Sequence, residues 1–161
     1  NELSEDILDY NYQIWTGNRM LDMILNEKSK EAKDKKIDMQ INTEVFTTLP
    51  FTDREIISLF GNLLDNAIEA CERITDKNTW IHIKMKKKNQ LLYFEIKNTT
   101  EHIVQPLPGK FISTKTNGTL HGYGMKNIMD VVEKYRGIFQ SQMVEDYFVV
   151  MISVYADIYS K

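Results

Sequence analysis

The sequence predicts an α/β fold, a two-layer sandwich in which helices cover one face of a mixed sheet, with an N-terminal helical extension. Hydrophobic periodicity alternates along the chain between a helical repeat of 3.6 residues and a strand repeat of two. The inferred order is helix, strand, helix, two strands, long loop, helix, two strands, and no internal repeat is visible. With 161 residues and 42% hydrophobic content, the chain has the size and core of one domain.

Each expected helix has a recognisable start or stop signal. The helical stretches run over residues 4–35, 52–71 and 124–135. The first contains no proline, and Gly17 is a possible break within it. The second opens on a capping-box pattern, Thr52-Asp53-Arg54-Glu55, and Gly137 ends the third. We expect the second helix to be the most regular element of the chain.

The remaining regular segments alternate in hydrophobicity as strands do. The expected strands cover residues 37–41, 80–87, 91–98, 138–144 and 147–155. Residues 88–90 and Glu145-Asp146 are expected to form hairpin turns. Lys84 and Lys86–Lys88 are interpreted as the solvent face of a hairpin and as protection of an edge strand. Residues 99–121 are expected to form a long loop, and loops of this length in compact domains are often functional.

Composition argues against several functional classes. Twenty basic and 23 acidic residues give a net charge of -3, which disfavours binding to nucleic acid or anionic lipid. The longest apolar run, Tyr147–Ala156, is far shorter than the ~20 residues of a membrane-spanning helix. Cys71 is the only cysteine, which excludes an internal disulfide framework and suits a reducing compartment. We therefore expect a cytoplasmic domain that is not membrane-inserted, and the start at Asn1 suggests a piece of a longer chain.

The central helix carries a second, polar stripe. Asn62, Asp65, Asn66 and Glu69 follow the spacing i, i+3, i+4, i+7, so their oxygen-bearing side chains are expected to point one way. A solvated helix face is the simpler interpretation of such a stripe. Asparagine, however, is a poor helix former whose amide oxygen is a suitable ligand for Mg²⁺.

A glycine pair follows the long loop. His121-Gly122-Tyr123-Gly124-Met125 is expected to form a turn that opens the third helix, where backbone N–H groups and the helix dipole favour phosphate. An ordinary loop-to-helix turn is the alternative. The pattern gains weight only together with the polar stripe of the central helix.

The two motifs together resemble the GHKL ATP-binding superfamily, whose fold is of the Bergerat type, and within it the catalytic domains of sensor histidine kinases. Residues 62–70 are similar to the family's N box and residues 121–125 to its second glycine box. Gly17-Asn18, Leu21-Asp22, Asn26 and Ile112–Lys115 resemble the peptide-sensing, quorum-sensing subgroup of Gram-positive bacteria. The resemblance covers residues 17–156 and implies ATP and Mg²⁺ as cofactors.

Site roles follow from that resemblance. It implies that Asn66 binds the Mg²⁺ that bridges the ATP phosphates and that Asn62 makes a second polar contact, so that Asn62 and Asn66 are the expected catalytic residues. Glu69 stands where many histidine kinases have a basic residue, so it could hold a metal-bound water or face solvent. Gly122 and Gly124 would donate backbone N–H groups to phosphate. The neighbouring residues of the ATP-binding set are Asp65, His121, Tyr123 and Met125, and His121 could equally be a packing residue of the loop.

One family motif is missing. The first glycine box, DxGxG, should follow the strand that ends near Asn98, but the sequence there reads Asn98-Thr99-Thr100. Asn98 would replace the aspartate that accepts a hydrogen bond from the adenine amino group. Thr114 and Lys115 lie in the expected lid over the nucleotide, where Lys115 could reach a phosphate or remain an ordinary loop lysine. The same alternatives apply to Lys110.

The resemblance favours phosphoryl transfer over hydrolysis. Hydrolysing members carry a glutamate at the position of Asn62, and an amide cannot take a proton at neutral pH.

The acceptor histidine is expected upstream of this chain, because His82, His102 and His121 all lie outside the N-terminal helix. Residues 1–16 would end a dimerisation helix and residues 17–161 would form the catalytic domain. Expected partners are its own dimerisation and phosphoacceptor domain, a second copy in the full-length protein, and a response regulator. A GHKL ATPase or a degenerate nucleotide-binding scaffold are the alternatives.

Overall fold

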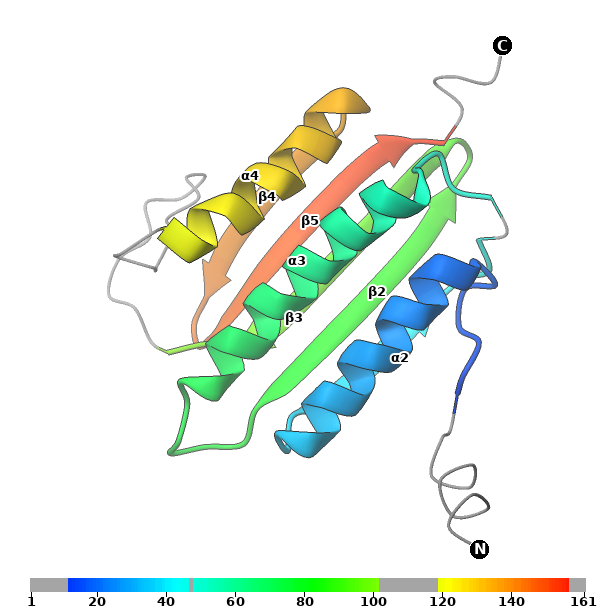
Figure 1. Cartoon of the computed structure of the whole chain (residues 1–161). Coiled ribbons are helices and arrows are strands. Elements are labelled where there is room, and N and C mark those ends of the chain that lie inside the picture. Colours follow the sequence, from blue (N-terminus) through cyan, green and yellow to red (C-terminus); the bar gives the residue numbers. More distant parts are fainter. Residues whose placement is uncertain (1–11, 47, 102–118, 157–161) are drawn as a thin grey trace, which may run out of the picture.

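A sheet and a layer of helices form the body of the molecule (Figure 1). The computed structural model describes residues 12–46, 48–101 and 119–156, and for residues 119–123 it describes the backbone alone. In chain order the elements are α2 (Arg19–Asp34), β1 (Asp38–Thr43), α3 (Asp53–Glu72), β2 (Trp80–Lys88), β3 (Leu91–Thr99), α4 (Thr119–Lys134), β4 (Ile138–Val144) and β5 (Tyr147–Tyr155). The predicted α/β class and element order are confirmed.

The strands form one mixed, five-stranded sheet in the order β1-β2-β3-β5-β4. β1 pairs with β2 in parallel, because α3 lies between them and returns the chain to the same end of the sheet. The other neighbours are antiparallel. Both tight hairpins turn through residues with positive φ, Asn89 at 56° and Glu145 at 53°, in agreement with the predicted turns.

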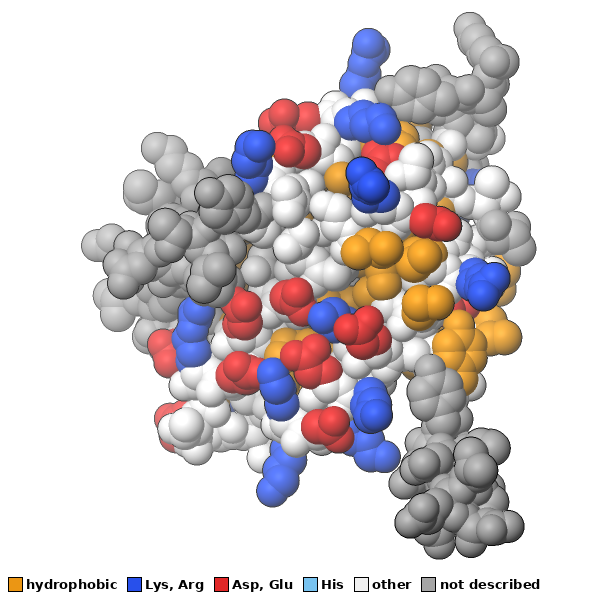
Figure 2. Space-filling view, viewed as in Figure 1, with side chains coloured by type: hydrophobic (Ala, Val, Ile, Leu, Met, Phe, Trp, Pro, Cys, Tyr) orange, Lys and Arg blue, Asp and Glu red, His pale blue; other side chains and the backbone are white. Residues whose placement is uncertain are grey.

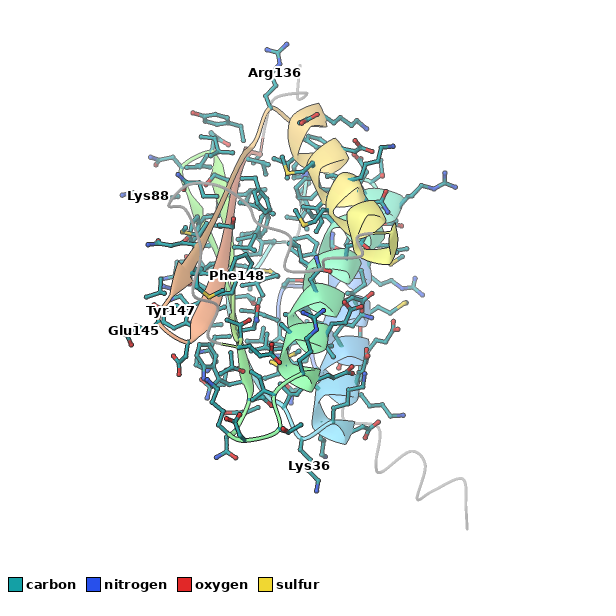
Figure 3. The ribbon with its side chains drawn as sticks, turned by 90° about the vertical axis from the view of Figure 1, so that its left-hand side faces the viewer. Lys36, Lys88, Arg136, Glu145, Tyr147 and Phe148 are labelled. Carbon is teal, nitrogen blue, oxygen red and sulfur yellow. The ribbon has the colours of Figure 1, made fainter. Side chains whose placement is uncertain are left out.

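All three described helices cover the same face of the sheet, and α3 lies between α2 and α4 (Figures 1 and 3). The position of α3 explains its apolar stripe, since Ile56, Leu59, Phe60, Leu64 and Ile68 are at most 1% exposed. Phe60 meets Phe94 of β3 edge to face, with ring centroids 5.1 Å apart. The polar residues of α3 lie off this apolar face, with Asp65 toward α2 and Asn62 toward α4.

The start of α3 follows the predicted capping box. The Thr52 hydroxyl accepts a bond from Glu55 N–H, and Glu55 Oε1 accepts one from Thr52 N–H. Glu55 also ties this end of α3 to the end of α4, because Tyr135 Oη donates to Glu55 Oε1 at 2.6 Å and Lys134 Nζ lies 3.1 Å from Glu55 Oε2. The C-terminal end of α4 is thereby fixed against α3.

The predicted helix over residues 4–35 is only partly correct. Residues 1–11 lie outside the described residues, and from Tyr12 to Asn18 the chain is not helical. α2 begins at Arg19, where the Asn18 side chain caps it by accepting a bond from Leu21 N–H. Gly17, the predicted break, lies in the non-helical segment before α2 and has a φ of 83°, which is outside the helical range.

Two further expectations need correction. The third helix begins at Thr119 rather than at Gly124, so Gly122 and Gly124 lie within α4 and not in a turn that precedes it. β2 is not an edge strand, because it pairs with β1 on one side and β3 on the other. Only Lys86–Lys88 extend past the last residue paired with β1, Met85, so protection of an edge does not explain Lys84.

Within the part of the chain that the structure describes, no helix is both long enough and apolar enough to cross a membrane.

Candidate functional site

Two amide oxygens converge where α3 passes α4. Asn62 donates from Nδ2 to the Ser58 carbonyl oxygen at 2.5 Å, which orients its side chain along α3. A Cβ placed on Gly124 would lie 3.3 Å from Asn62 Oδ1 and 3.9 Å from Asn66 Oδ1. Asn66 Nδ2 meanwhile lies 3.8 Å from Met125 Sδ. The side chains predicted from the N box and the backbone of the second glycine box thus meet in space.

This arrangement is chemically suited to a hard cation. Mg²⁺ prefers oxygen ligands and usually keeps several water molecules, together with one or two protein groups and substrate phosphates. Asn62 and Asn66 supply two such oxygens next to Gly124, whose lack of a side chain lets α4 come close to both amides. The residues present therefore fit a Mg²⁺–phosphate group, and Asn66 with Asn62 would hold it.

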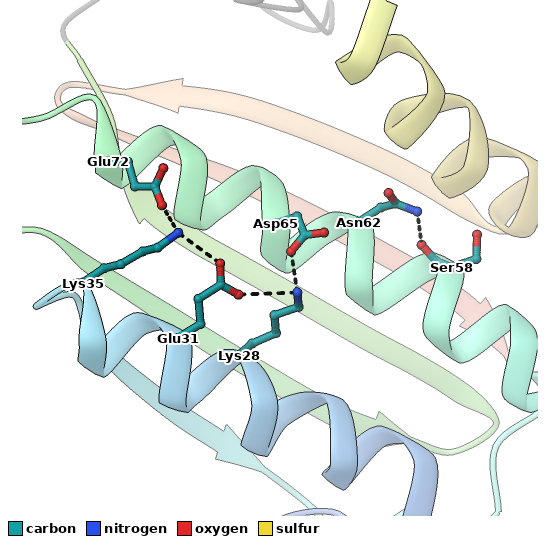
Figure 4. Close-up of polar contacts among 7 residues, drawn as sticks. All are labelled: Lys28, Glu31, Lys35, Ser58, Asn62, Asp65 and Glu72. Carbon is teal, nitrogen blue, oxygen red and sulfur yellow. Dashed lines mark hydrogen bonds and ion pairs between the residues drawn. The ribbon is translucent and has the colours of Figure 1, made fainter.

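Asp65 does not belong to this group. Its Oδ1 accepts a hydrogen bond from Lys28 Nζ of α2 at 2.5 Å, and Lys28 also lies 3.5 Å from Glu31 Oε2 (Figure 4). Burial by itself would lower the pKa of Lys28, but the bond to Asp65 and the nearby carboxylates outweigh it and raise that pKa. The prediction that all four polar residues of the stripe point one way is therefore wrong, because Asp65 faces α2 while Asn62 and Asn66 face α4.

Sequence reasoning missed Lys28 because nothing local connects it to Asp65. The two residues are 37 positions apart, and only the packing of α2 on α3 brings them together. The same interface continues with Lys35, which pairs with Glu31 at 3.1 Å and with Glu72. Charged side chains accordingly gather over the C-terminal parts of α2 and α3 (Figure 2). These pairs align the helices but, being partly exposed, each contributes little to stability.

Asn98 lies at the end of β3 and is only 4% exposed. It pairs with Ile81 of β2 and Phe148 of β5, and its Nδ2 donates to the Thr99 carbonyl oxygen at 2.9 Å. Because the amide nitrogen is engaged inside the protein, the side-chain oxygen is the atom suited to accept a bond from a ligand. The geometry is compatible with the predicted adenine contact, which stays a prediction.

Cys71, which lies outside the N box and the glycine boxes, holds this end of the sheet against α3. Its Sγ lies 3.4 Å from Thr99 Oγ1 and 3.6 Å from the Trp80 carbonyl oxygen. Burial raises the pKa of the Cys71 thiol, so the group stays neutral at physiological pH. The contact connects the helix that carries Asn66 to the strand that carries Asn98. Its only signal in the sequence was the apolar position of Cys71 on α3.

The other predicted site residues are less fully placed. Glu69 is half-buried on α3, one turn beyond Asp65, and its predicted role is untested. His121, Gly122 and Tyr123 lie in the first turns of α4, where only the backbone is described. Lys110, Thr114 and Lys115 lie outside the described residues, so the lid contacts remain predictions.

The chain is similar in sequence to known proteins. A family model described as the GHKL domain matches residues 52–155. A probable C4-dicarboxylate sensor kinase from Halalkalibacterium halodurans is 26% identical over 118 residues, which cover 67% of this chain and 22% of that protein. The chain therefore spans about a fifth of the curated relative that it matches.

Solved structures share the fold. The catalytic domain of the histidine kinase ThkA, in a nucleotide-free form, superposes with a TM-score of 0.67 at 21% identity, covering 86% of this chain and 91% of that one. The same kinase in complex with the response regulator TrrA gives a TM-score of 0.64 at 18% identity, covering 96% and 46%. The family match contains α3, β2, β3, α4, β4 and β5, the elements that carry Asn62, Asn66, Asn98 and Gly124. By its sequence and its fold, the chain belongs to the GHKL domain family.

Proposed function

We propose that this chain is the ATP-binding catalytic domain of a two-component sensor histidine kinase. It would transfer the γ-phosphate of Mg²⁺-ATP to a histidine on an upstream dimerisation helix. The observation that carries the proposal is the convergence of Asn62 Oδ1 and Asn66 Oδ1 on the space beside Gly124. Membership of the GHKL family and the fold shared with histidine kinase catalytic domains support it.

Residues of α3 and the start of α4 would make different contacts with the nucleotide. Asn66 and Asn62 offer oxygen ligands, while the start of α4 offers the positive end of a helix dipole to the phosphates. When bound, Mg²⁺ would neutralise charge that develops on the phosphates during transfer. Asn98, whose Nδ2 donates to the Thr99 carbonyl oxygen, would accept a bond from the adenine amino group.

Transfer is favoured over hydrolysis by the chemistry of Asn62. Its Nδ2 donates to the Ser58 carbonyl oxygen, so the amide is held in place along α3. An amide at this position can orient a ligand but cannot remove a proton from water at neutral pH. The domain therefore positions ATP, and the acceptor histidine of the partner helix defines the reaction.

Three further inferences, on assembly, partner and location, concern the whole protein. We infer a homodimer built through the upstream helices, a cognate response regulator, and a cytoplasmic location. The fold shared with a histidine kinase that was solved in complex with a response regulator supports the second of these. We also infer that the protein belongs to the peptide-sensing, quorum-sensing subgroup, which Gly17-Asn18 and Leu21-Asp22 resemble.

Binding of a fluorescent ATP analogue to this chain, with and without Mg²⁺, tests the proposal. We expect Mg²⁺-dependent binding that is lost in Asn66→Ala and kept in Asn78→Ala, a matched change at an exposed loop position. Binding that survives Asn66→Ala would refute the metal assignment. Absence of binding by the unaltered chain would favour a degenerate scaffold.

Phosphoryl transfer is tested with γ-labelled ATP. The chain alone should bind the nucleotide without labelling itself, because its acceptor lies elsewhere, and it should label a separate dimerisation helix that carries the histidine. Label on the chain itself would contradict the proposed acceptor. Steady-state release of inorganic phosphate would instead favour an ATPase.

A further inference from the structure

The segment that precedes α2 is held to the domain by a buried carboxylate. Asp22, in the first turn of α2, is 2% exposed. One of its oxygens, Oδ1, accepts hydrogen bonds from Thr16 N–H at 2.9 Å, Thr16 Oγ1 at 2.8 Å and Trp15 N–H at 3.3 Å. The other, Oδ2, accepts from Gly17 N–H at 3.0 Å. Three successive backbone N–H groups thus surround one carboxylate, as in the backbone concavities that bind anions.

A second contact lies one helical turn further along α2. Asn26 Oδ1 accepts from Gln13 N–H at 2.9 Å, and Asn26 Nδ2 donates to the Gln13 carbonyl oxygen at 2.8 Å. The same Nδ2 lies 2.7 Å from the Asp22 carbonyl oxygen. Asn26 therefore holds both backbone groups of Gln13 and orients them against α2. We call Gln13, Thr16, Asp22 and Asn26 the Asp22 cluster.

The segment is also bound from the side of β1. Thr43 Oγ1 donates to the Trp15 carbonyl oxygen at 3.0 Å, and Phe46 N–H donates to the Thr16 carbonyl oxygen at 2.6 Å. Trp15 packs on the hydrophobic core, and Gly17 turns the chain into α2 with a φ of 83°. Residues 13–17 are therefore joined to two elements that the chain reaches only later.

This arrangement differs from an ordinary flexible linker, whose backbone is solvated by water. Release of the segment would leave the Asp22 carboxylate without its donors, and a buried charge without hydrogen bonds is costly. Residues from Gln13 onward should therefore move with the ATP-binding domain, whereas the sequence predicts that residues 1–16 end a dimerisation helix.

We propose that Asp22 is a positioning residue for phosphoryl transfer: the Asp22 cluster holds residues 13–17 on the ATP-binding domain and so fixes the direction in which the chain leaves that domain. The proposal rests on the proposed kinase function. Transfer requires the γ-phosphate and the acceptor histidine to meet in a narrow range of geometries. A released segment would widen that range and slow transfer without weakening the binding of ATP.

Amide hydrogen exchange in this chain tests the physical part of the inference. The N–H groups of Gln13, Thr16 and Gly17 should exchange at least about 100-fold more slowly than in an unfolded chain. Asp22→Ala should abolish that protection at Thr16 and Gly17, while amides of α3 and β3 stay protected. Unprotected amides in the unaltered chain, or protection that survives Asp22→Ala, would overturn the inference.

Asn26→Ala provides a milder variant in case Asp22→Ala impairs folding. Asn26 is only partly buried and alanine is the better helix former, so the fold should be kept while Gln13 loses its protection. Lys30→Ala, an exposed position on the same helix, is the matched control and should leave Gln13 protected. Equal exchange rates of the Gln13 N–H in the unaltered chain, Asn26→Ala and Lys30→Ala would contradict the role of Asn26.

The functional part is tested in the full-length protein by single-turnover autophosphorylation. We expect Asp22→Ala and Asn26→Ala to lower the transfer rate at least about tenfold, with the dissociation constant of the ATP analogue unchanged within about twofold. Unchanged transfer in variants that have lost amide protection would refute the positioning role. If the unaltered protein transferred no phosphate at all, the kinase proposal would fail, while the exchange measurements would still decide whether the segment is fixed.

Discussion

Replacement of Gly124 by alanine separates stability from nucleotide binding. Gly124 lies within α4 and has no positive φ, so its backbone conformation does not require glycine. Alanine in a helix interior is more favourable than glycine by about 0.5–1 kcal/mol. The new Cβ, however, would lie 3.3 Å from Asn62 Oδ1, and Asn62 is held in place by its bond to Ser58. Breaking that bond costs about 1 kcal/mol, so the two effects should nearly cancel in the free energy of unfolding.

Nucleotide binding, unlike the free energy of unfolding, should be clearly weakened by Gly124→Ala. The Cβ would lie where the oxygens of Asn62 and Asn66 converge, so it should displace the predicted metal and phosphate ligands. We expect Gly124→Ala to weaken Mg²⁺-ATP binding at least about tenfold, equivalent to about 1.4 kcal/mol. Titration of a fluorescent ATP analogue and chemical denaturation measure the two quantities.

Gly61 provides a matched control, because it lies within α3 next to Asn62 and a Cβ there would meet no atom within 4 Å. Gly61→Ala should therefore stabilise the protein by about 0.5–1 kcal/mol and leave ATP binding unchanged. In an Asn62→Ala background, Gly124→Ala should recover the same stabilisation, because the crowded amide has been removed. The reasoning would be refuted if Gly124→Ala bound Mg²⁺-ATP as tightly as the unaltered chain.

Three other changes probe the structure around the site. Burial alone would raise the pKa of Glu55, but the bonds from Tyr135, Thr52 and Lys134 outweigh it and lower that pKa. Glu55 therefore contributes stability above the unfolded pKa of about 4.3, and this is lost as the pH falls through the lower folded value. Glu55→Gln should make the acid decline of the unfolding free energy shallower. Cys71, 2% exposed and with a raised pKa, should react with a thiol reagent at least about 100-fold more slowly when folded than when unfolded. Gly137→Ala should lower the unfolding free energy by about 1–3 kcal/mol, because its Cβ would lie 2.9 Å from the Ser153 carbonyl oxygen, which cannot easily move.

Specific results would contradict the expectations for Glu55, Cys71 and Gly137. Equal pH profiles for Glu55→Gln and the unaltered chain, with exposed Asp76→Asn as control, would remove Glu55 as a source of acid sensitivity. Rapid modification of the folded protein would show that α3 and β3 separate readily around Cys71. A thermal midpoint of Gly137→Ala equal to that of Gly61→Ala would contradict the close packing at Gly137.

Secondary structure was predictable wherever its cause is local. The capping box at Thr52 and Glu55 depends on residues three positions apart, and the turn at Glu145 lies between two alternating runs. The start of α4 was predicted too late, because the glycines of residues 121–125 indicated a turn, whereas α4 already begins at Thr119. Local propensity alone could not decide between a glycine turn and a helix that contains glycine.

The sequence by itself determined the α/β class, the order of elements and the N-box spacing that places Asn62 and Asn66 one turn apart. It did so because helical and strand periodicity and capping are short-range properties. Only the tertiary structure decided that Asp65 turns to Lys28 while Asn62 and Asn66 turn to Gly124. It also decided that Asp22 binds the preceding segment. Which neighbour a helix face meets depends on how α2, α3 and α4 pack on the sheet, and residues 37 positions apart carry no local sign of that contact.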